Sequence, residues 1–176
     1  MSDSHDDITN THKAMDIFEQ NDVKIVIHAG DIISPPIVKE FARLTEKGIK
    51  LFGILGNNDG EKRGLQNAFD SINGRLLGDI GKIEIDGLKF GIYHGQDLKK
   101  KEKLIKSNKF DVFIYGHTHT KDPNNGELKK VGKTIVLNPG SVHRTEKTHY
   151  TNPQYFKESS ILVFDTISKQ YKFFNL

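Results

Sequence analysis

The sequence contains no cysteine among its 176 residues. This absence excludes disulfides, thiolate metal sites and cysteine nucleophiles, so carboxylate, imidazole and amide groups are left to perform any chemistry. It also weakly favours a cytoplasmic location, because disulfides are rare in that compartment.

Long hydrophobic runs are missing as well. No stretch approaches the roughly 18 apolar residues that a membrane span requires. The N-terminal residues are acidic and polar, whereas a secretory signal begins with a basic region followed by an apolar one. We therefore expect neither export nor membrane insertion.

Charge of one sign is not concentrated in the chain. Lysine and arginine number 26 and aspartate and glutamate 23, for a formal net charge of +3. This is mildly favourable for anionic substrates but far from the charge of a nucleic-acid binder, so we expect no stable nucleic-acid partner. Leu98, Leu104 and Ile105 share a segment with the densest lysine group, which favours the solvated face of an amphipathic helix over a phosphate-binding patch. That group comprises Lys99, Lys100, Lys101, Lys103 and Lys106.

Apolar runs rich in β-branched residues alternate with segments of helical period, a pattern typical of an α/β layered domain. The pattern predicts helices over 9–20, 35–44, 61–72 and 98–107. It predicts strands over 23–29, 50–55, 82–85, 88–93, 111–115, 134–137, 161–164 and 171–174. Asp86-Gly87 predicts a hairpin turn, and the polar segment 141–160 predicts a long loop. We expect one domain over 1–176, an α/β two-sheet sandwich with antiparallel additions.

Five short motifs lie at the chain start or where an apolar strand gives way to a loop, and ligands in open α/β sheets collect at such strand ends. They are Asp3-Ser4-His5, Gly30-Asp31, Gly56-Asn57-Asn58-Asp59, His94-Gly95 and Gly116-His117-Thr118-His119. Residues at i and i+2 of an extended segment point to the same side. We therefore expect Asp3 and His5 to reach one point together, and His117 and His119 likewise.

The residue types in these motifs indicate a metal centre. Imidazole, carboxylate and amide groups suit divalent manganese, iron, zinc or nickel, whereas calcium prefers oxygen ligands alone. The candidate ligands are Asp3, His5, Asp31, Asn57, His94, His117 and His119. Seven groups are too many for one ion. Two ions about 3.5 to 4 Å apart, bridged by a carboxylate and a hydroxide, would use them all and stabilise an in-line displacement at phosphorus.

A single histidine is more often structural or solvent-facing than a ligand. Four of the eight histidines nevertheless occupy motif positions, and coincidence is a poor account of all four. The remaining histidines are assigned no ligand role; the most that we expect of His28 is packing behind the ligands. A phosphate contact by Arg144, in the predicted loop, is a weaker hypothesis.

In this order the motifs resemble those of the calcineurin-like metallophosphoesterases, and among them the small YfcE-type phosphodiesterases. The resemblance runs from Asp3 to about Ser141 and includes Asn138-Pro139-Gly140-Ser141, typical of this subgroup. It implies a four-layer α/β/β/α fold in which two sheets are flanked by helices. It also implies that Asp31 bridges two divalent ions, manganese first and nickel, iron or zinc as alternatives. Asp3, His5 and His119 would hold one ion, and Asn57, His94 and His117 the other. A hydroxide between the ions would attack a phosphodiester.

The sequence departs from this family at three places. Asn58 stands where many relatives have a catalytic histidine; its amide donates hydrogen bonds, for example to a phosphate oxygen, but transfers no proton. Relatives carry an apolar strand before Asp-x-His. We therefore expect that the natural protein has a few more apolar residues at its start, and that Asp3 and His5 otherwise lie on a fraying terminus. The loop 141–160 is longer than usual.

Two alternatives to the phosphodiesterase remain open. A phosphomonoesterase would use the same ions and differ only in the surrounding pocket. A protein-binding scaffold like the retromer subunit Vps29 would have the same fold with a compromised metal site, which the seven intact positions disfavour. The resemblance further implies a small phosphoester substrate and a homodimer or homotetramer.

Overall fold

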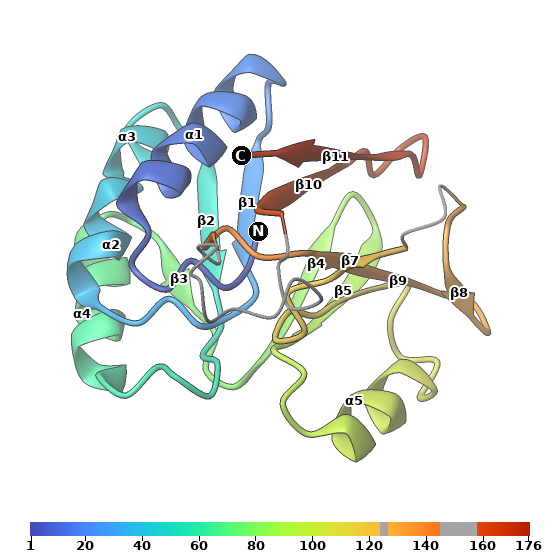
Figure 1. The fold of residues 1–176 in the computed structure, drawn as a ribbon. Coiled ribbons are helices and arrows are strands. Elements are labelled where there is room, and N and C mark those ends of the chain that lie inside the picture. The colour runs from blue at the N-terminus through green and yellow to red at the C-terminus, as the bar shows by residue number, and fades with distance from the viewer. Residues whose placement is uncertain (124–126, 145–157) are drawn as a thin grey trace, which may run out of the picture.

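The structure is a computed structural model that describes residues 1–123, 127–144 and 158–176. A first sheet holds three parallel strands in the order β1-β2-β3. Helices precede this sheet or connect its strands (Figure 1). The elements are α1 (Ile8–Gln20), β1 (Ile25–His28), α2 (Pro35–Glu40), α3 (Ala42–Thr45), β2 (Lys50–Gly53), α4 (Lys62–Ser71) and β3 (Arg75–Leu76).

A second sheet contains six strands, and its core order is β4-β5-β6-β9-β7, with β8 paired to β9. Its elements are β4 (Ile80–Ile85), β5 (Leu88–Tyr93), α5 (Leu98–Ile105), β6 (Val112–Ile114), β7 (Lys121–Asp122), β8 (Lys130–Val131) and β9 (Thr134–Pro139). The expected hairpin joins β4 to β5, whereas β5, β6 and β9 are parallel neighbours. The chain ends with an antiparallel pair, β10 (Ser160–Phe164) and β11 (Tyr171–Asn175).

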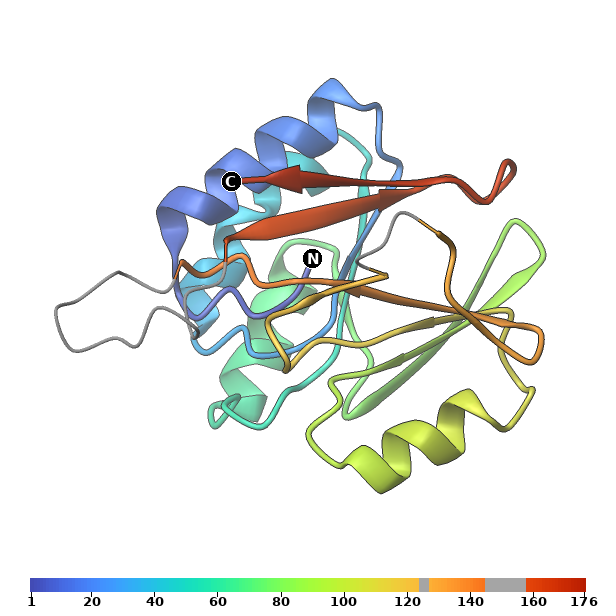
Figure 2. The same cartoon turned by 45° about the vertical axis from the view of Figure 1, so that its right-hand side comes forward.

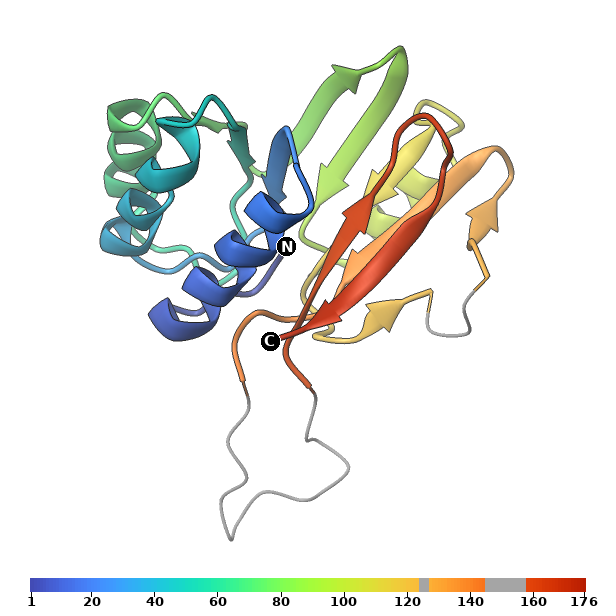
Figure 3. The same ribbon diagram turned by 90° about the horizontal axis from the view of Figure 1, so that it is seen from above.

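Apolar packing organises these elements into four layers. Ala29 and Ile54, which directly follow β1 and β2, pack with Ile92 of β5, so the two main sheets face each other. Helices α1, α2 and α4 bury their apolar faces on the outer side of the first sheet, and α5 covers the outer side of the second through Ile105. Figures 2 and 3 show these helices on opposite sides of the paired sheets. The expected α/β/β/α arrangement is confirmed.

Most of the predicted elements are confirmed, and the differences have local causes. The helix expected over 35–44 is interrupted at Phe41, whose N–H bonds to carbonyls of the preceding turn, so α2 and α3 are separate. Three two-residue strands, β3, β7 and β8, were not predicted. Leu98, expected on the apolar face of its helix, is 61% exposed. Most of the predicted loop 141–160, including His149, lies outside the described residues.

The N-terminal residues pair with β1, so the expected fraying terminus is wrong. The amino group of Met1 donates to the carbonyl of Ile27 at 2.9 Å, and the N–H of Ala29 donates to the carbonyl of Met1 at 3.0 Å. Asp3 continues this pairing through its N–H to the carbonyl of Gly30, at 2.9 Å. As a result, Asp3 is 0% exposed.

None of the described helices is long and apolar enough to span a bilayer. An apolar cavity of about 350 Å³ lies between β1, β10 and the second sheet, against Ile27, Phe90 and Leu162. None of the seven candidate ligands lines it. The candidate ligands instead follow the ends of the strands or lie at the start of the chain.

Candidate metal centre

The candidate ligands follow the ends of four strands and the paired N-terminal segment. Asp31 follows β1, Asn57 follows β2, His94 follows β5, and His117 and His119 follow β6. Because these parallel strands end at the same edge of the two facing sheets, their loops meet there. Asp3 and His5 reach the same edge because residues 1–3 run beside β1.

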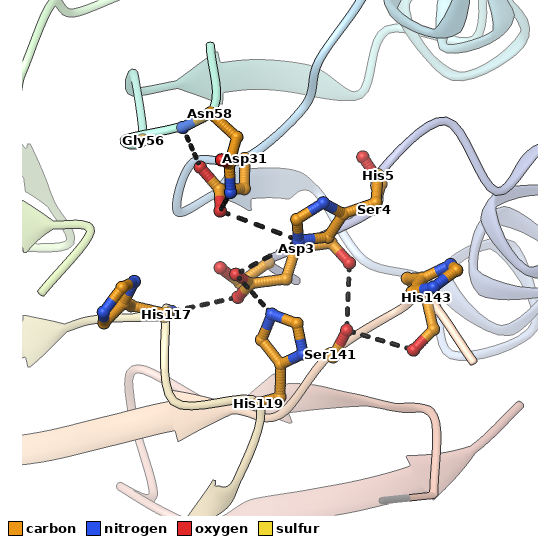
Figure 4. A network of polar contacts seen from close by, with 12 residues as sticks. Asp3, Ser4, His5, Asp31, Gly56, Asn58, His117, His119, Ser141 and His143 are labelled. Carbon is orange, nitrogen blue, oxygen red and sulfur yellow. Dashed lines mark hydrogen bonds and ion pairs between the residues drawn. The ribbon is translucent and has the colours of Figure 1, made fainter. Parts of the chain in front are cut away.

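Two buried carboxylates form the middle of this cluster (Figure 4). Oδ1 of Asp3 lies 3.2 Å from Nε2 of His119 and 3.8 Å from Nε2 of both His5 and His94. Oδ2 of Asp31 lies 3.2 Å from Nε2 of His94 and 3.6 Å from Nε2 of His5. Two overlapping groups result, Asp3-His5-His119 and Asp3-Asp31-His94, and within each the ligand atoms lie within 4.8 Å of one another.

The imidazole rings form two separate pairs. The ring centroids of His5 and His119 are 5.2 Å apart, and those of His94 and His117 are also 5.2 Å apart. The expectation that His117 and His119 reach one point together is therefore wrong. It assumed an extended segment, but both residues have a left-handed backbone, with φ of 67° and 54°. Asn57 lies in the exposed turn after Gly56.

Left-handed backbone is a shared property of the candidate ligands. Five of the seven have positive φ: Asp3 (55°), His5 (42°), Asp31 (55°), His117 (67°) and His119 (54°). This conformation is uncommon for residues other than glycine, and it concentrates at functional sites where surrounding contacts enforce it. Gly30 has φ of 95°, and a Cβ there would lie 2.7 Å from Nδ1 of His94, so a glycine is required beside the ligands.

The two carboxylates remain ionised despite their burial. Burial opposes the charged form of Asp3, but contacts with His119 and His5 outweigh it and hold the pKa of Asp3 well below its usual range. Burial likewise opposes ionisation of Asp31, and contacts with His94 and with the backbone N–H of Asn58 lower its pKa. The cluster thus holds two negative charges that a cation would neutralise.

The tautomer of His94 suits a ligand. Its Nδ1 lies 2.8 Å from the carbonyl of Ala29, so Nδ1 carries the proton in the neutral ring and the lone pair of Nε2 is available to a cation held beside the carboxylates. Three of the six buried side-chain atoms that have no hydrogen-bond partner among the described residues lie together here: Oδ1 of Asp3 and Nε2 of both His5 and His94. Buried polar atoms without partners are rare. Their convergence fits a bound divalent cation, and the oxygen and nitrogen donor set fits the metals expected from the sequence.

Other side chains hold the ligand loops in place. Ser4 Oγ donates to the carbonyl of Ile32 at 3.5 Å and lies 3.0 Å from Nε2 of His28, which confirms packing behind the ligands for His28. Ser141 Oγ donates to the carbonyl of Asp3 at 3.0 Å. The amide of Asn138 donates to the carbonyl of Gly116 at 3.2 Å and to Oγ1 of Thr118 at 3.0 Å. The Asn-Pro-Gly-Ser motif therefore supports two ligand loops at once.

Sequence reasoning missed two further residues. The sequence assigns no role to His143, yet its ring centroid lies 5.6 Å from that of His5, at the rim of the cluster. Its position two residues after Ser141 was the available indication. Asp59 was noted only as the end of a motif, although its carboxylate is buried behind Asp31. Arg144 is exposed, and its backbone N–H donates to Asp7.

Comparisons with known proteins agree with this geometry. The model of the calcineurin-like phosphoesterase superfamily domain matches residues 1–157. The phosphodiesterase MJ0936 of Methanocaldococcus jannaschii is 41% identical over 141 residues, which cover 80% of each chain. The phosphodiesterase YfcE of Escherichia coli is 26% identical over 80% of this chain and 76% of its own.

A solved structure of an archaeal phosphodiesterase superimposes with a TM-score of 0.82 at 36% identity. The match covers all of this chain and 97% of the other. The sequence match, the shared four-layer fold and the Asp/His cluster at the strand ends lead to one conclusion. This chain belongs to the calcineurin-like phosphoesterase superfamily.

Proposed function

We propose that this protein is a phosphodiesterase that works with two divalent metal ions. The observation that supports this most directly is that Nε2 of His5 and Nε2 of His94, both buried and without a hydrogen-bond partner, converge on the equally unpartnered Oδ1 of Asp3 and on the carboxylate of Asp31. If no cation bound here, each of these buried atoms would stay without a partner, which costs about 1–3 kcal/mol of folding free energy per atom.

The assignment of ligands follows the two imidazole pairs. Asp3, His5 and His119 are the ligands of one ion, which agrees with the distances of 3.2 and 3.8 Å around Oδ1 of Asp3. His94 and His117, with Asn57, are the ligands of the other. Asp31 would be shared by the two ions, in agreement with the distances from its Oδ2 to Nε2 of His5 in the first set, 3.6 Å, and to Nε2 of His94 in the second, 3.2 Å.

Bound ions would supply Lewis-acid activation of water near neutral pH and neutralise charge on the phosphate. The chain's own residues orient the reacting groups. Asn58 holds Asp31 through its backbone N–H and its side-chain amide. The side chain of His143, which is 42% exposed and lies beside His5, is placed to meet the substrate at the rim. The contacts of Ser141 and Asn138 keep the ligand loops together.

Diester hydrolysis is preferred to the alternatives on two grounds. The relatives that match over most of this chain are named phosphodiesterases, which favours a diester over a phosphomonoester. The scaffold alternative requires a degraded metal site, but Asp3, Asp31 and His94 are buried and converge. Manganese is the metal that we expect first, with nickel, iron or zinc as alternatives. We further propose a small phosphoester substrate, a cytoplasmic location and a homo-oligomer.

The test is an assay of metal-stripped protein re-supplied in turn with manganese, nickel, zinc and magnesium. Bis(p-nitrophenyl) phosphate is the diester and p-nitrophenyl phosphate the monoester control. We expect metal-dependent turnover that is faster for the diester, and calorimetric binding of two ions per chain. Turnover of the monoester alone would favour the phosphomonoesterase, and the absence of both metal binding and turnover would favour the scaffold.

A further inference from the structure

The carboxylate of Asp59 accepts four backbone hydrogen bonds. Oδ1 accepts the N–H groups of Ile32 at 2.8 Å and Ile33 at 2.7 Å. Oδ2 accepts those of Asp31 at 3.0 Å and Gly56 at 2.6 Å. Asp59 is 3% exposed, so these N–H groups and not water are the partners of the charge. Hydrogen bonds to a charged acceptor are roughly twice as strong as neutral ones.

The turn that Asp59 holds has an unfavourable backbone. Asp31 has φ of 55°, and Ile33 has φ of 87°, which is a genuine outlier for a β-branched residue. Such conformations cost roughly 1–3 kcal/mol each and persist only where the surroundings enforce them. In this turn the enforcing contacts are the N–H bonds of Asp31, Ile32 and Ile33 to one carboxylate.

The same carboxylate connects two ligand loops. Its bond to Gly56 ties the turn after β2 to the turn after β1. Gly56 lies so close to Asp31 that a Cβ on it would be 2.9 Å from the Asp31 carboxyl carbon. The candidate ligand Asn57 lies in the chain between Gly56 and Asp59, the two residues that this hydrogen bond joins. Asp59 therefore sets the position of the candidate bridge relative to a ligand of the second ion.

A direct role as a ligand does not fit Asp59. Both of its oxygens are occupied by N–H donors, and it belongs to neither of the groups whose ligand atoms lie within 4.8 Å of one another. Resting on the proposed function, we propose that Asp59 is a positioning residue that shapes the two-ion site by holding Asp31 and the Gly56-Asn57 turn in register.

The substitution Asp59→Asn tests this, because the amide keeps the size of the carboxylate but replaces one acceptor oxygen with a donor. We expect the affinity for Mn²⁺ in calorimetry to fall roughly 10- to 100-fold, the range typical of residues that orient metal ligands. We also expect one of the two pairs of amides, Ile32 with Ile33 or Asp31 with Gly56, to exchange hydrogen more than about 10-fold faster in metal-free protein, because the oxygen that accepts from that pair is replaced by an NH2 group.

Asp165→Asn is the matched control. Oδ1 of Asp165 also accepts two backbone N–H groups, those of Ile167 and Ser168, but in an exposed turn between β10 and β11. This variant should leave both Mn²⁺ affinity and exchange at the four amides unchanged. A drop in stability of Asp59→Asn with wild-type Mn²⁺ affinity and wild-type exchange would overturn the inference.

Two further measurements keep the outcomes distinct. If Asp59→Asn does not fold, exchange in the wild-type protein decides. The amides of Ile32 and Ile33 should be protected although they lie outside helices and strands, and exchange at the rate of exposed peptide would overturn the inference. If the wild-type protein binds no Mn²⁺, the proposed function fails. The exchange comparison still tests whether Asp59 holds the turn.

Discussion

The side-chain amide of Asn58 donates a hydrogen bond to Oδ2 of Asp31 at 2.7 Å, and its backbone N–H donates to Oδ1 of the same carboxylate at 2.9 Å. Both oxygens of the candidate bridge are thus held by one residue (Figure 4). By its residue type this amide can donate to a phosphate oxygen, and in the structure it donates to Asp31. Asn58 acts on the bridge, and a proton donor for the leaving group is still missing at this position.

The first prediction concerns Asn58→His, which places a proton donor beside the cluster. General acid catalysis contributes roughly 10²- to 10⁴-fold, mainly for leaving groups that depart poorly. We expect kcat/KM to rise selectively for an alkyl diester, while an aryl diester changes little or loses activity because the amide contact to Asp31 is gone. The comparison is made at saturating metal with both substrates. An equal change for the two would contradict a role in leaving-group protonation.

The second prediction concerns the bridge itself. Asp31→Asn removes a negative charge that both ions would share, so we expect it to reduce turnover more than any other single ligand change, by more than about 100-fold. Metal content per chain should fall below two ions. Asp70→Asn, on the exposed face of α4, should change neither quantity. Two bound ions and near-normal turnover in Asp31→Asn would show that Asp31 does not bridge.

The third prediction concerns pH and uses metal-free protein. Burial lowers the pKa of His28 to about 3 in the folded protein, from the ordinary value of 6.5 that we take for the unfolded chain. Between these values the unfolded chain binds one proton more, so this histidine decreases the free energy of unfolding as pH falls from 6.5 toward 3. His28→Gln keeps a donor for Ser4 and removes the titration. In urea unfolding at pH 6, 5 and 4.5, the free energy of unfolding should therefore fall less steeply with decreasing pH in His28→Gln than in the wild-type protein, by up to about 1.4 kcal/mol per pH unit. Parallel pH profiles of the free energy of unfolding in the two proteins would contradict this role of His28.

The position of the site was predictable because the sequence shows it locally. Four apolar strands, β1, β2, β5 and β6, are followed by glycine and a ligand type, as in Gly30-Asp31 and His94-Gly95, and parallel strands bring such residues to one edge. The layers were predictable for the same reason, since strands and helices of ordinary length show their periodicity. The strands β3, β7 and β8 have two residues each, too few to show any period.

The conformation of the ligand loops was not predictable. Alternation along an extended segment suggested that His117 and His119 act together, but positive φ at both residues turns one toward His94 and the other toward His5. The role of Asp59 was equally unpredictable from the sequence, because nothing in its own motif shows that its carboxylate accepts hydrogen bonds from the N–H groups of a turn 26 to 28 residues earlier. Such contacts depend on the packing of two loops and leave no trace in local pattern.

The last prediction concerns Asn138, at the end of β9 and 0% exposed. Its amide bonds to Gly116 and Thr118 support the loop of His117 and His119, so Asn138→Ala should weaken Mn²⁺ binding roughly 10- to 100-fold. Because it also leaves buried groups unpaired, it should lower the free energy of unfolding by about 1–3 kcal/mol.

Thr134→Val separates these two effects of Asn138→Ala. Thr134 lies in the same strand, is equally buried, and donates from Oγ1 to the carbonyl of Phe110 at 2.8 Å, a contact that involves none of the candidate ligands. Both variants should therefore lose stability in urea unfolding of metal-free protein. Only Asn138→Ala should lose Mn²⁺ affinity in calorimetry, because only Asn138 fixes the loop on which two ligands lie. Equal Mn²⁺ affinities in the two variants would mean that the loop keeps its conformation without the amide, and that Asn138 contributes to stability alone.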